Sequence, residues 1–236
     1  MPPYQCVRPN AERSSPMTEA VVLADTPLFA NLDPDSLDVL AASCSRRSLA
    51  RGDVLFHQDD ESGALYIVVS GRIAIANRSF DGRESMVALM EDGDLFGEMG
   101  LFDDGEGRSA DARALEPSEL IELPYDPIRE LFTNQPGLLW GVVSMLSKRV
   151  RAMDNALADS VFLDVTGRTA KRLLEMAGDE DEFELPLTQE ELAGMVGASR
   201  ERVNKSINQF IKLGWMAQTD RGYRVTNREQ LTIRSR

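Results

Sequence analysis

The pattern of apolar and polar positions changes character twice along the chain. Residues 19–45 predict one or two short helices, with Asp33 as an N-cap and Pro34 in the first turn. Residues 49–125 instead carry short apolar or alternating runs, separated by turn signals such as RGD, SGR and EDGD. Short strands at a regular spacing are typical of an antiparallel barrel or sandwich. We expect positive φ angles at the turn glycines Gly52, Gly63, Gly71, Gly82 and Gly93.

From Pro127 onward the pattern becomes helical. A short helix around IRELFTN should end before Pro136, and residues 136–163 then predict one long helix. Its apolar seam follows the 3-4-3-4-3 spacing of a two-stranded coiled coil and consists of Val143, Leu146, Val150, Met153, Leu157 and Ser160. The alternative is that this stripe packs on the preceding strands. We favour a dimer, because Lys148, Arg149, Arg151 and Asp154 border a narrow stripe.

The segment after the long helix predicts a further helix, RTAKRLLEMAG, followed by a solvated acidic loop, DEDEFE. Residues 188–213 then read TQEELAGMVGASRERVNKSINQFIKL. Thr188 and Glu191 form a capping box, Gly197 supplies a sharp turn and Ser199 caps a second helix. The buried stripe of that helix is Val203, Ile207, Phe210 and Ile211. This is a helix-turn-helix, and WMAQTDRGYRVTN predicts a hairpin, or wing, after it.

The outward side of the second helix predicts contact with DNA. It presents Arg200, Glu201, Arg202, Asn204 and Lys205 in its first two turns. Arginine can donate two bonds to guanine, and glutamate can accept one from cytosine. Arg202, Lys205 and Gln189 are expected at phosphates, and Thr188 and Ser199 complete the predicted DNA-binding set. A plain helical hairpin with a solvated charged face is the alternative, and the combination of cap, glycine and basic face disfavours it.

Charge separates the chain into two parts with different partners. The net charge of −13 arises from 26 basic and 39 acidic residues. Residues 1–184 hold 17 basic and 34 acidic residues, a balance of −17, whereas residues 185–236 hold 9 and 5, a balance of +4. The basic end therefore agrees with a nucleic-acid partner.

The remaining composition excludes several classes of protein. No apolar run has the length of a membrane span. The start of the chain lacks the apolar region of a signal peptide. We therefore predict a polar tail at residues 1–18, in which Met17 could be the natural start. Two separate cysteines, Cys6 and Cys44, indicate a reduced cytoplasmic protein without an iron–sulfur cluster. With His57 as the single histidine, we expect no metal site and no catalytic residues.

Residues 94–110, DLFGEMGLFDDGEGRSA, form the other informative stretch. This stretch contains glycines, a lone Glu98 and the pair Arg108–Ser109, a combination typical of a binding site for a small anionic ligand. The alternative is that Arg108 is a surface arginine that offsets the neighbouring acids Asp103, Asp104 and Glu106.

Three segments together resemble one known family. FGEMGLFDDGEGRSA resembles its phosphate-binding cassette, DVTGR at 164–168 its hinge and VGASRERVNK its recognition helix. Over residues 24–230 the chain resembles the family of the cyclic AMP receptor protein and the fumarate–nitrate regulator, nearest the cyclic-AMP-responsive branch. The cysteine cluster of the iron–sulfur branch is absent, and His57 lies in the wrong segment for the haem-sensing branch.

The resemblance implies an α+β fold and four segments. These are a tail at 1–18, a cyclic-nucleotide-binding antiparallel β-roll at 19–135, a dimerisation helix at 136–163 and a winged helix-turn-helix at 164–236. It further implies cyclic AMP as effector, bound by the cassette residues Gly97, Glu98, Met99, Arg108, Ser109 and Ala110. In this family a Thr-Ser or Thr-Asn pair meets the adenine, and this chain departs from that pattern with Met153 and Asp154.

Within the cassette, the resemblance implies a role for each polar group. Gly97 would bring a backbone N–H against the cyclic phosphate, and Arg108 would pair its charge. Ser109 would add a hydroxyl donor, and Glu98 would accept from the ribose 2′-OH. At the position opposite the adenine, Met153 offers no hydrogen bond, whereas Asp154 could accept from the adenine amino group.

We therefore expect a cytoplasmic homodimeric transcription regulator. It would bind double-stranded DNA at TGTGA-like inverted repeats under the control of cyclic AMP, contact RNA polymerase and have no membrane partner. Met153 and Asp154 leave a second interpretation open, a DNA-binding protein that acts without a ligand. An enzyme such as a cyclic nucleotide phosphodiesterase is disfavoured, because one histidine cannot supply its metal ligands.

Overall fold

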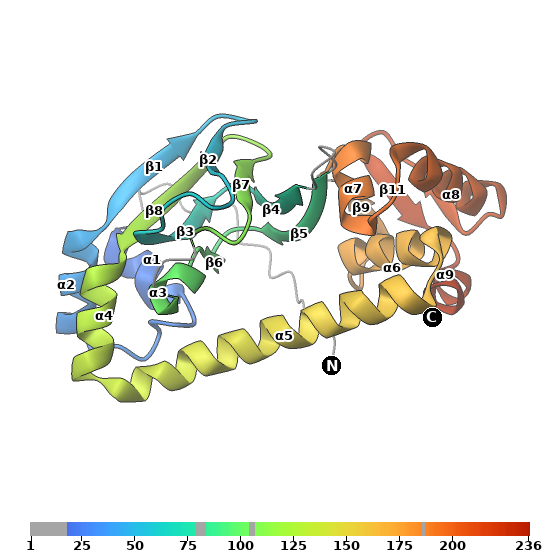
Figure 1. Ribbon diagram of the computed structural model, residues 1–236. Helices are drawn as coiled ribbons and strands as arrows, with labels where there is room; N and C mark the ends of the chain where they lie inside the picture. Colours follow the sequence, from blue (N-terminus) through green and yellow to red (C-terminus); the bar gives the residue numbers. More distant parts are fainter. Residues whose placement is uncertain (1–17, 79–83, 104–106, 186) are drawn as a thin grey trace. The chain divides into compact units, whose positions relative to one another are not determined.

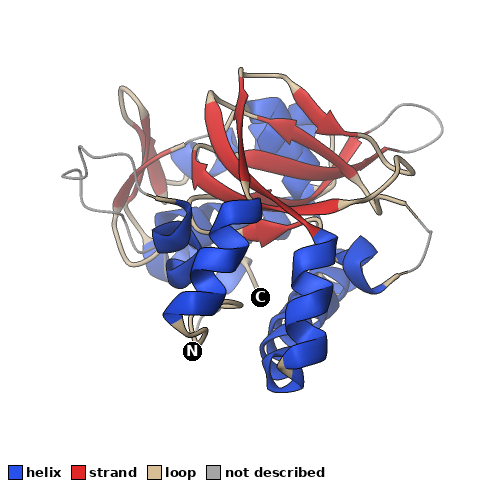
Figure 2. Cartoon of the chain, turned by 90° about the vertical axis from the view of Figure 1, so that its left-hand side faces the viewer, coloured by secondary structure: helices blue, strands red, loops and turns tan. Residues whose placement is uncertain are grey.

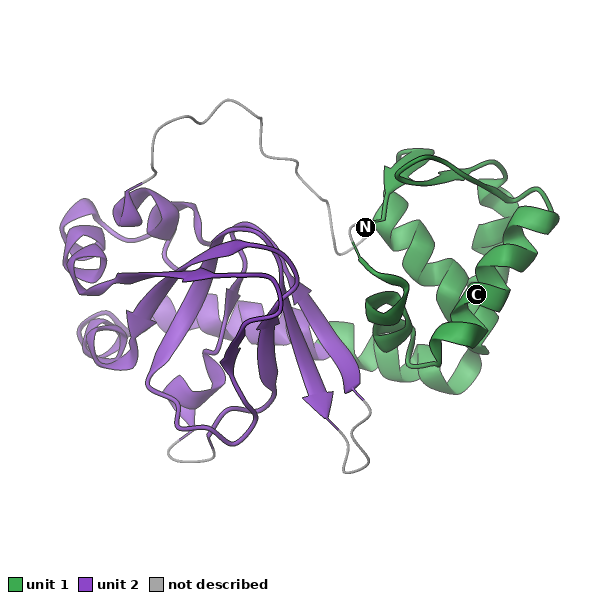
Figure 3. Cartoon of the chain, turned by 90° about the horizontal axis from the view of Figure 1, so that it is seen from above, with its two compact units in different colours: residues 1–13, 151–236 green, residues 14–150 purple. Residues whose placement is uncertain are grey.

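The computed structural model describes residues 18–78, 84–103, 107–185 and 187–236 (Figure 1). The chain forms two compact units, one of residues 14–150 and one that contains residues 151–236 (Figure 3). We call them the N-terminal unit and the C-terminal unit. Almost all of the predicted polar tail, and Gly82, lie outside the described residues. Among the residues that are described, no helix has the length and apolar character needed to cross a membrane.

The N-terminal unit begins with two short helices, α1 (Glu19–Asp25) and α2 (Pro34–Ser43). As predicted, Asp33 caps α2, and its carboxylate accepts from the Ser36 backbone N–H. The strands that follow are β1 (Ser45–Leu49), β2 (Val54–Phe56), β3 (Ala64–Ser70), β4 (Ile73–Arg78), β5 (Glu84–Met90), β6 (Leu95–Phe96), β7 (Asp111–Ala114) and β8 (Ser118–Pro124). The remaining helices are α3 (Met99–Phe102), α4 (Tyr125–Asn134) and the 3-10 turn η1 (Pro136–Leu138).

The strands form two antiparallel four-stranded sheets, in the orders β1-β8-β3-β6 and β2-β7-β4-β5, which confirms the predicted antiparallel β architecture. In Figure 2 the helices of this unit lie beneath its strands. Strand β3 is buried on both faces, which explains its continuous apolar run. Leu65 and Ile67 pack in the cluster that includes the helices, whereas Tyr66 and Val68 pack in a second cluster with residues of the other sheet.

Two strands of this unit were not predicted, and one expected turn glycine was wrong. Ser45–Leu49 is a strand paired with β8, although its sequence, SRRSL, is polar; ion pairs such as Arg47–Glu122 at 2.5 Å accompany this pairing. The short strand β6 was also missed. Gly52, Gly71 and Gly93 have positive φ as predicted, but Gly63 does not. Its carbonyl accepts from the Tyr125 N–H at 2.9 Å, which continues the β3–β8 ladder rather than making a turn.

The C-terminal unit contains the predicted helix-turn-helix. Its helices are α6 (Val165–Ala177), α7 (Gln189–Val196), α8 (Arg200–Lys212) and α9 (Arg228–Arg234). Its three-stranded sheet has the order β10-β11-β9, from β9 (Glu182–Glu184), β10 (Met216–Gln218) and β11 (Gly222–Val225). The capping box of Thr188 and Glu191 is present, and Gly197 ends α7 in the left-handed conformation at φ 66°. Ser199 occupies the N-cap of α8 but makes no side-chain capping bond.

The predicted solvated loop of DEDEFE is wrong in its second half. Glu182–Glu184 forms β9, which pairs with β11 beside the predicted hairpin. Phe183 is only 6% exposed, and its ring centroid lies 6.3 Å from that of Tyr223. The five acids around it masked this single buried aromatic in the sequence pattern.

The beginning and the end of this unit also differ from expectation. Helix α6 begins at Val165, inside the DVTG segment, because Asp164 caps it through the Gly167 N–H. Helix α9 was not predicted, and its Arg234 forms an ion pair with Asp164. A Cβ at Gly167 would lie 3.1 Å from the Arg234 carbonyl oxygen, so a glycine suits this close approach.

The long helix is α5 (Leu139–Phe162), which crosses from one unit to the other. Most of its predicted seam is exposed, including Val150, Met153 and Leu157 at 56–65%. Leu146 is an exception, because it is half-buried against the core of the N-terminal unit. For this residue the alternative interpretation, in which the stripe packs on its own chain, is correct. The apolar surface that is free on α5 therefore includes Val143 and then runs from Val150 toward Phe162.

We predict that Phe183→Ala destabilises the C-terminal unit by about 3 kcal/mol, because it deletes a buried aromatic ring from the core. Urea unfolding followed by the fluorescence of Trp215, in a Trp140→Phe background, measures this change in the unit that contains Trp215. The exposed neighbour Glu182 provides the control Glu182→Ala, which should cost less than ~1 kcal/mol. Equal effects of the two substitutions would contradict the buried placement of Phe183.

Candidate effector pocket and nucleic-acid interface

The cassette residues Gly97 and Arg108 are brought together by the backbone. Glycine is required at position 97, because φ is 77° and a Cβ would lie 2.8 Å from Arg108 Nη1. Arg108 is held by two main-chain bonds, from its N–H to the Asp60 carbonyl at 2.9 Å and from the Asp59 N–H to its own carbonyl at 2.8 Å. These contacts fix the guanidinium beside the end of β6.

The Arg108 side chain is buried, at 6% exposure, so the interpretation of Arg108 as a surface arginine is wrong. Its Nη1 donates to the Gly97 carbonyl at 3.2 Å and to the Tyr125 hydroxyl at 3.3 Å. The guanidinium carbon lies 4.2 Å from the ring centroid of Phe56 and 5.4 Å from that of Tyr66. Aromatic faces attract a cation but do not neutralise it.

No carboxylate forms an ion pair with Arg108 in the part of the chain that the structure describes, and its Nε has no hydrogen-bond partner there. A buried cation without a counter-charge is costly. Charge-assisted bonds from guanidinium to a phosphate or carboxylate would offset this cost. The residues at this site therefore fit a small anionic group.

Glu98 follows Gly97 in the cassette and is 1% exposed. One carboxylate oxygen forms an ion pair with Arg149 of α5, whereas the other, Oε2, has no hydrogen-bond partner among the described residues. Arg149 also donates to the Leu95 carbonyl. Glu98 thus joins the cassette to the long helix and retains an oxygen that can accept a further hydrogen bond.

Tyr125 supports the same corner of the pocket. Burial is the main cause that raises the pKa of its phenol, so the hydroxyl remains protonated at neutral pH. The hydroxyl can then donate to the Gly97 carbonyl while it accepts from Arg108. This arrangement orients both the glycine turn and the guanidinium.

The other predicted ligand residues are placed as follows. The Ser109 hydroxyl is exposed and lies 3.4 Å from the sulfur of Met99, which is also exposed. Ala110, which follows Ser109 in the sequence, is buried. Met153 and Asp154 both have exposed side chains on α5. Sequence reasoning missed four further residues that contact Arg108 or Glu98. They come from distant elements: Phe56, Tyr66, Tyr125 and Arg149.

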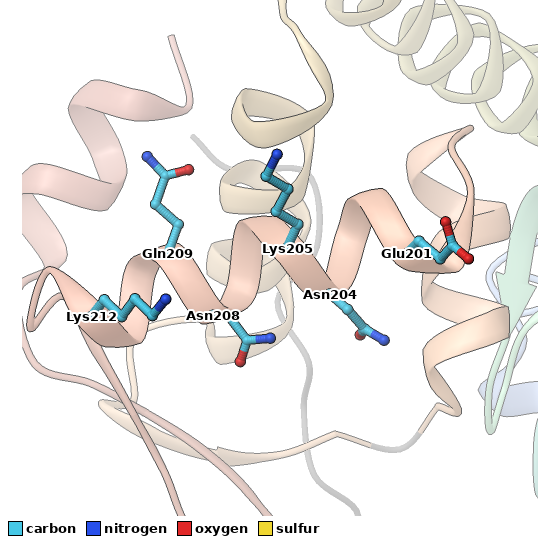
Figure 4. A pocket seen from close by; sticks show the side chains of 6 residues that line it. All are labelled: Glu201, Asn204, Lys205, Asn208, Gln209 and Lys212. Carbon is cyan, nitrogen blue, oxygen red and sulfur yellow. The ribbon is translucent and has the colours of Figure 1, made fainter.

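The second candidate site is the exposed face of α8. Its buried stripe is Val203, Ser206, Ile207 and Phe210, and Ile211 is half-buried. A groove runs along the opposite side, where Figure 4 shows its lining side chains, Glu201, Asn204, Lys205, Asn208, Gln209 and Lys212. Asn208, Gln209 and Lys212 were not among the predicted DNA-binding residues.

The basic side chains of α8 differ from those elsewhere in the C-terminal unit. Arg172, Arg224 and Arg234 each form an ion pair with an acidic side chain of the same unit. In contrast, no ion pair with a described residue involves the exposed basic residues of α8, which are Arg200, Arg202, Lys205 and Lys212. These cations are available to phosphates and to base edges.

The remaining predicted DNA-binding residues flank this face. Thr188 and Ser199 are exposed at the starts of α7 and α8, and Gln189 is partly exposed in the first turn of α7. Backbone N–H groups at a helix N-terminus favour phosphate, so the starts of α7 and α8 suit contact with the DNA backbone, as the face of α8 does.

Comparison with known proteins identifies both parts of the chain. Residues 46–135 match the family described as cyclic nucleotide-binding domain, and residues 167–233 match the Crp-like helix-turn-helix domain. The chain is 33% identical over 222 residues to a CRP-like cAMP-activated global transcriptional regulator of Mycobacterium tuberculosis, which covers 91% of this chain and 99% of that protein. It is 32% identical to the cAMP-activated global transcriptional regulator CRP of Salmonella typhimurium, over 75% of this chain and 87% of that one.

Among solved structures, the c-di-GMP-responsive global regulator CLP of Xanthomonas campestris superimposes with a TM-score of 0.72 and 26% identity. The match covers 82% of this chain and 99% of that one. Relatives with the same architecture therefore respond, by their names, to different cyclic nucleotides.

We predict that Arg149→Leu destabilises the N-terminal unit by about 3 kcal/mol, because it leaves the Glu98 carboxylate buried without its cation. Thermal unfolding of the full chain measures the effect. The exposed neighbour provides the control Arg151→Leu, which should have little effect. In a double-mutant cycle, Glu98→Gln should recover part of the loss, and strictly additive effects would show that the pair is not coupled.

Proposed function

This chain belongs to the family of the cyclic AMP receptor protein and the fumarate–nitrate regulator, and we propose that it is a homodimeric regulator controlled by cyclic AMP. Family membership makes it a DNA-binding transcription regulator with a cyclic nucleotide-binding domain, and not an enzyme. The proposal adds the effector, the dimer, the TGTGA-like inverted repeats, RNA polymerase as a partner and action in the cytoplasm.

The observation that carries the effector proposal is the buried guanidinium of Arg108, which has no acidic partner among the described residues. A cyclic phosphate supplies one negative charge and acceptor oxygens for Arg108 and for the Ser109 hydroxyl. The unpartnered Oε2 of Glu98 suits the ribose 2′-OH as a donor. Relatives named as cAMP-activated support cyclic AMP over a larger cyclic dinucleotide.

Coupling of this pocket to α5 would run through the ion pair between Glu98 and Arg149. A ligand that hydrogen-bonds the same carboxylate changes the electrostatic environment of that pair. Since α5 also carries the exposed apolar surface, the ligand would bias the arrangement of the two subunits by its differential contacts.

The dimer proposal rests on the apolar surface of α5. Val150, Met153 and Leu157 are more than half exposed, one or two helical turns apart. A contiguous exposed apolar stripe marks an interaction site, and its heptad spacing suits an identical helix. Each subunit would then place one α8 on each half of an inverted repeat.

Met153 and Asp154 favour a second candidate function, DNA binding that does not require a ligand. The thioether of Met153 makes no strong hydrogen bond to an adenine. In that case the cassette would bind cyclic AMP weakly, and the affinity for DNA would not depend on it.

We predict that Arg108→Leu abolishes binding of cyclic AMP while the protein remains a folded dimer, because the substitution removes the cation placed for the phosphate. Isothermal titration calorimetry with cyclic AMP measures the loss, which should exceed about 100-fold in affinity. Arg113→Leu serves as the control. Arg113 of β7 is paired with Glu84 of β5, so this substitution should leave ligand affinity unchanged. Wild-type affinity in the Arg108 variant would refute the pocket.

We predict that Val150→Glu yields a monomer, because each chain would bury an unpaired carboxylate in the subunit interface. Sedimentation equilibrium measures the mass. Val87 on β5 has a similar exposure, 51% against 56%, so Val87→Glu is a matched control that should remain dimeric. A dimeric Val150→Glu protein with intact DNA binding would overturn the assignment of the α5 stripe.

A further inference from the structure

The groove of α8 contains the side-chain amide of Asn204, for which the proposed function names no partner on DNA. Asn204 lies in the second turn of α8, one helical turn after Arg200. Its Oδ1 atom is buried and has no hydrogen-bond partner among the described residues. The charged side chains Glu201 and Lys205 line the same groove.

A structural reason for asparagine at this position is lacking. Asparagine is a poor helix former in mid-helix, where its side chain competes with the backbone. Asn204 is neither a cap of α8 nor part of its buried stripe, which is Val203, Ser206, Ile207 and Phe210. Its amide oxygen therefore accepts no hydrogen bond from a described residue that would offset the poor propensity.

The amide is also free to present either edge outward. Rotation about χ2 of asparagine is a soft torsion. Since Oδ1 accepts no bond from the protein, turning the amide breaks no hydrogen bond of that oxygen. In Figure 4 Asn204 and Asn208 leave α8 on one side of the helix, whereas Lys205 and Gln209 leave it on the other.

The complementary group in a major groove is adenine. An amide has one acceptor and two donors and pairs bidentately with the adenine N6 amino group and N7. Four residues along a helix correspond to a rise of about 6 Å. That distance is roughly two base steps of about 3.4 Å each.

We propose that Asn204 is a specificity-determining residue that reads an A·T base pair within about two steps of the base pair contacted by Arg200. This inference rests on the proposed function of α8 as the recognition helix. It assigns the second turn of α8 to base readout, whereas Asn208 in the third turn lies beyond the bases that specify the half-site.

The test uses the full-length protein with cyclic AMP present and one fixed salt concentration. An inverted repeat is first selected from randomised duplex DNA with the wild-type protein. Binding of wild type, Arg200→Ala, Asn204→Ala and Asn208→Ala is then measured on every single-base-pair substitution of one half-site. Unfolding midpoints of the variants are recorded in parallel.

We expect Asn204→Ala to lose about 5- to 100-fold of discrimination at one A·T pair, distinct from the pair that depends on Arg200. The unfolding midpoint should stay the same or rise, because alanine is the better helix former. The isosteric Asn204→Asp should exchange that preference for a pair that presents a cytosine amino group, which a carboxylate can accept from. Asn208→Ala should keep the wild-type profile.

The outcomes separate this inference from the function beneath it. If the wild-type protein selects no sequence at all, the proposed DNA readout fails. If wild type is selective but Asn204→Ala lowers all affinities equally or not at all, Asn204 is not a readout residue and the recognition-helix proposal stands. Loss of the same preference in Asn208→Ala would equally overturn the assignment to Asn204.

Discussion

The cost of burying charge is the physical constraint on which the functional pocket depends. Arg108 is buried against Phe56 and Tyr66, where its guanidinium has two aromatic faces and two uncharged hydrogen-bond partners, Gly97 and Tyr125, but no counter-charge among the described residues. Glu98 is buried as deeply, and Arg149 of the long helix provides its counter-charge. One charge of the cassette is therefore paired with α5, and the other is left for an anion. This difference between two buried residues of the cassette underlies the proposed preference for an anionic ligand and gives the site a physical connection to α5.

The C-terminal unit shows the opposite arrangement on α8, where the basic side chains are exposed and form no ion pair with a described residue. Several arginines outside α8 form ion pairs within the unit, for instance Arg172 with Glu175 and Arg224 with Glu182. The sharp turn at Gly197 ends α7 before α8 begins, and it is possible because glycine adopts the left-handed conformation. The buried stripe of α8 anchors the helix, and its charged and amide face remains available for DNA.

Local sequence signals predicted the elements that local physics determines. The cap of α2 at Asp33, the capping box of Thr188 and Glu191 and the αL glycine at 197 each depend on residues within four positions. The motif around Gly97 and Arg108 also predicted that these two residues act together, and the Arg108 guanidinium does contact the Gly97 carbonyl. The strands Ser45–Leu49 and Glu182–Glu184 were missed, because both are rich in charge and are held by distant partners.

The rest of the pocket could not be read from the sequence for the same reason. Glu98 and Arg149 are 51 positions apart, and Arg108 meets Phe56 only after the sheets have formed. No periodicity links such residues. The unpartnered Oδ1 of Asn204 is likewise a fact of three-dimensional packing, because nothing in the string RERVNKS distinguishes this asparagine from an ordinary exposed one.

The most direct measurement is the affinity of the full-length protein for its selected inverted repeat, at one salt concentration, with and without cyclic AMP. If the cyclic nucleotide acts through the Glu98–Arg149 pair on α5, its saturation should tighten DNA binding by about 5- to 150-fold, the usual range of allosteric coupling. The same affinity in both conditions, with cyclic AMP shown by calorimetry to be bound, would contradict control of DNA binding by the pocket.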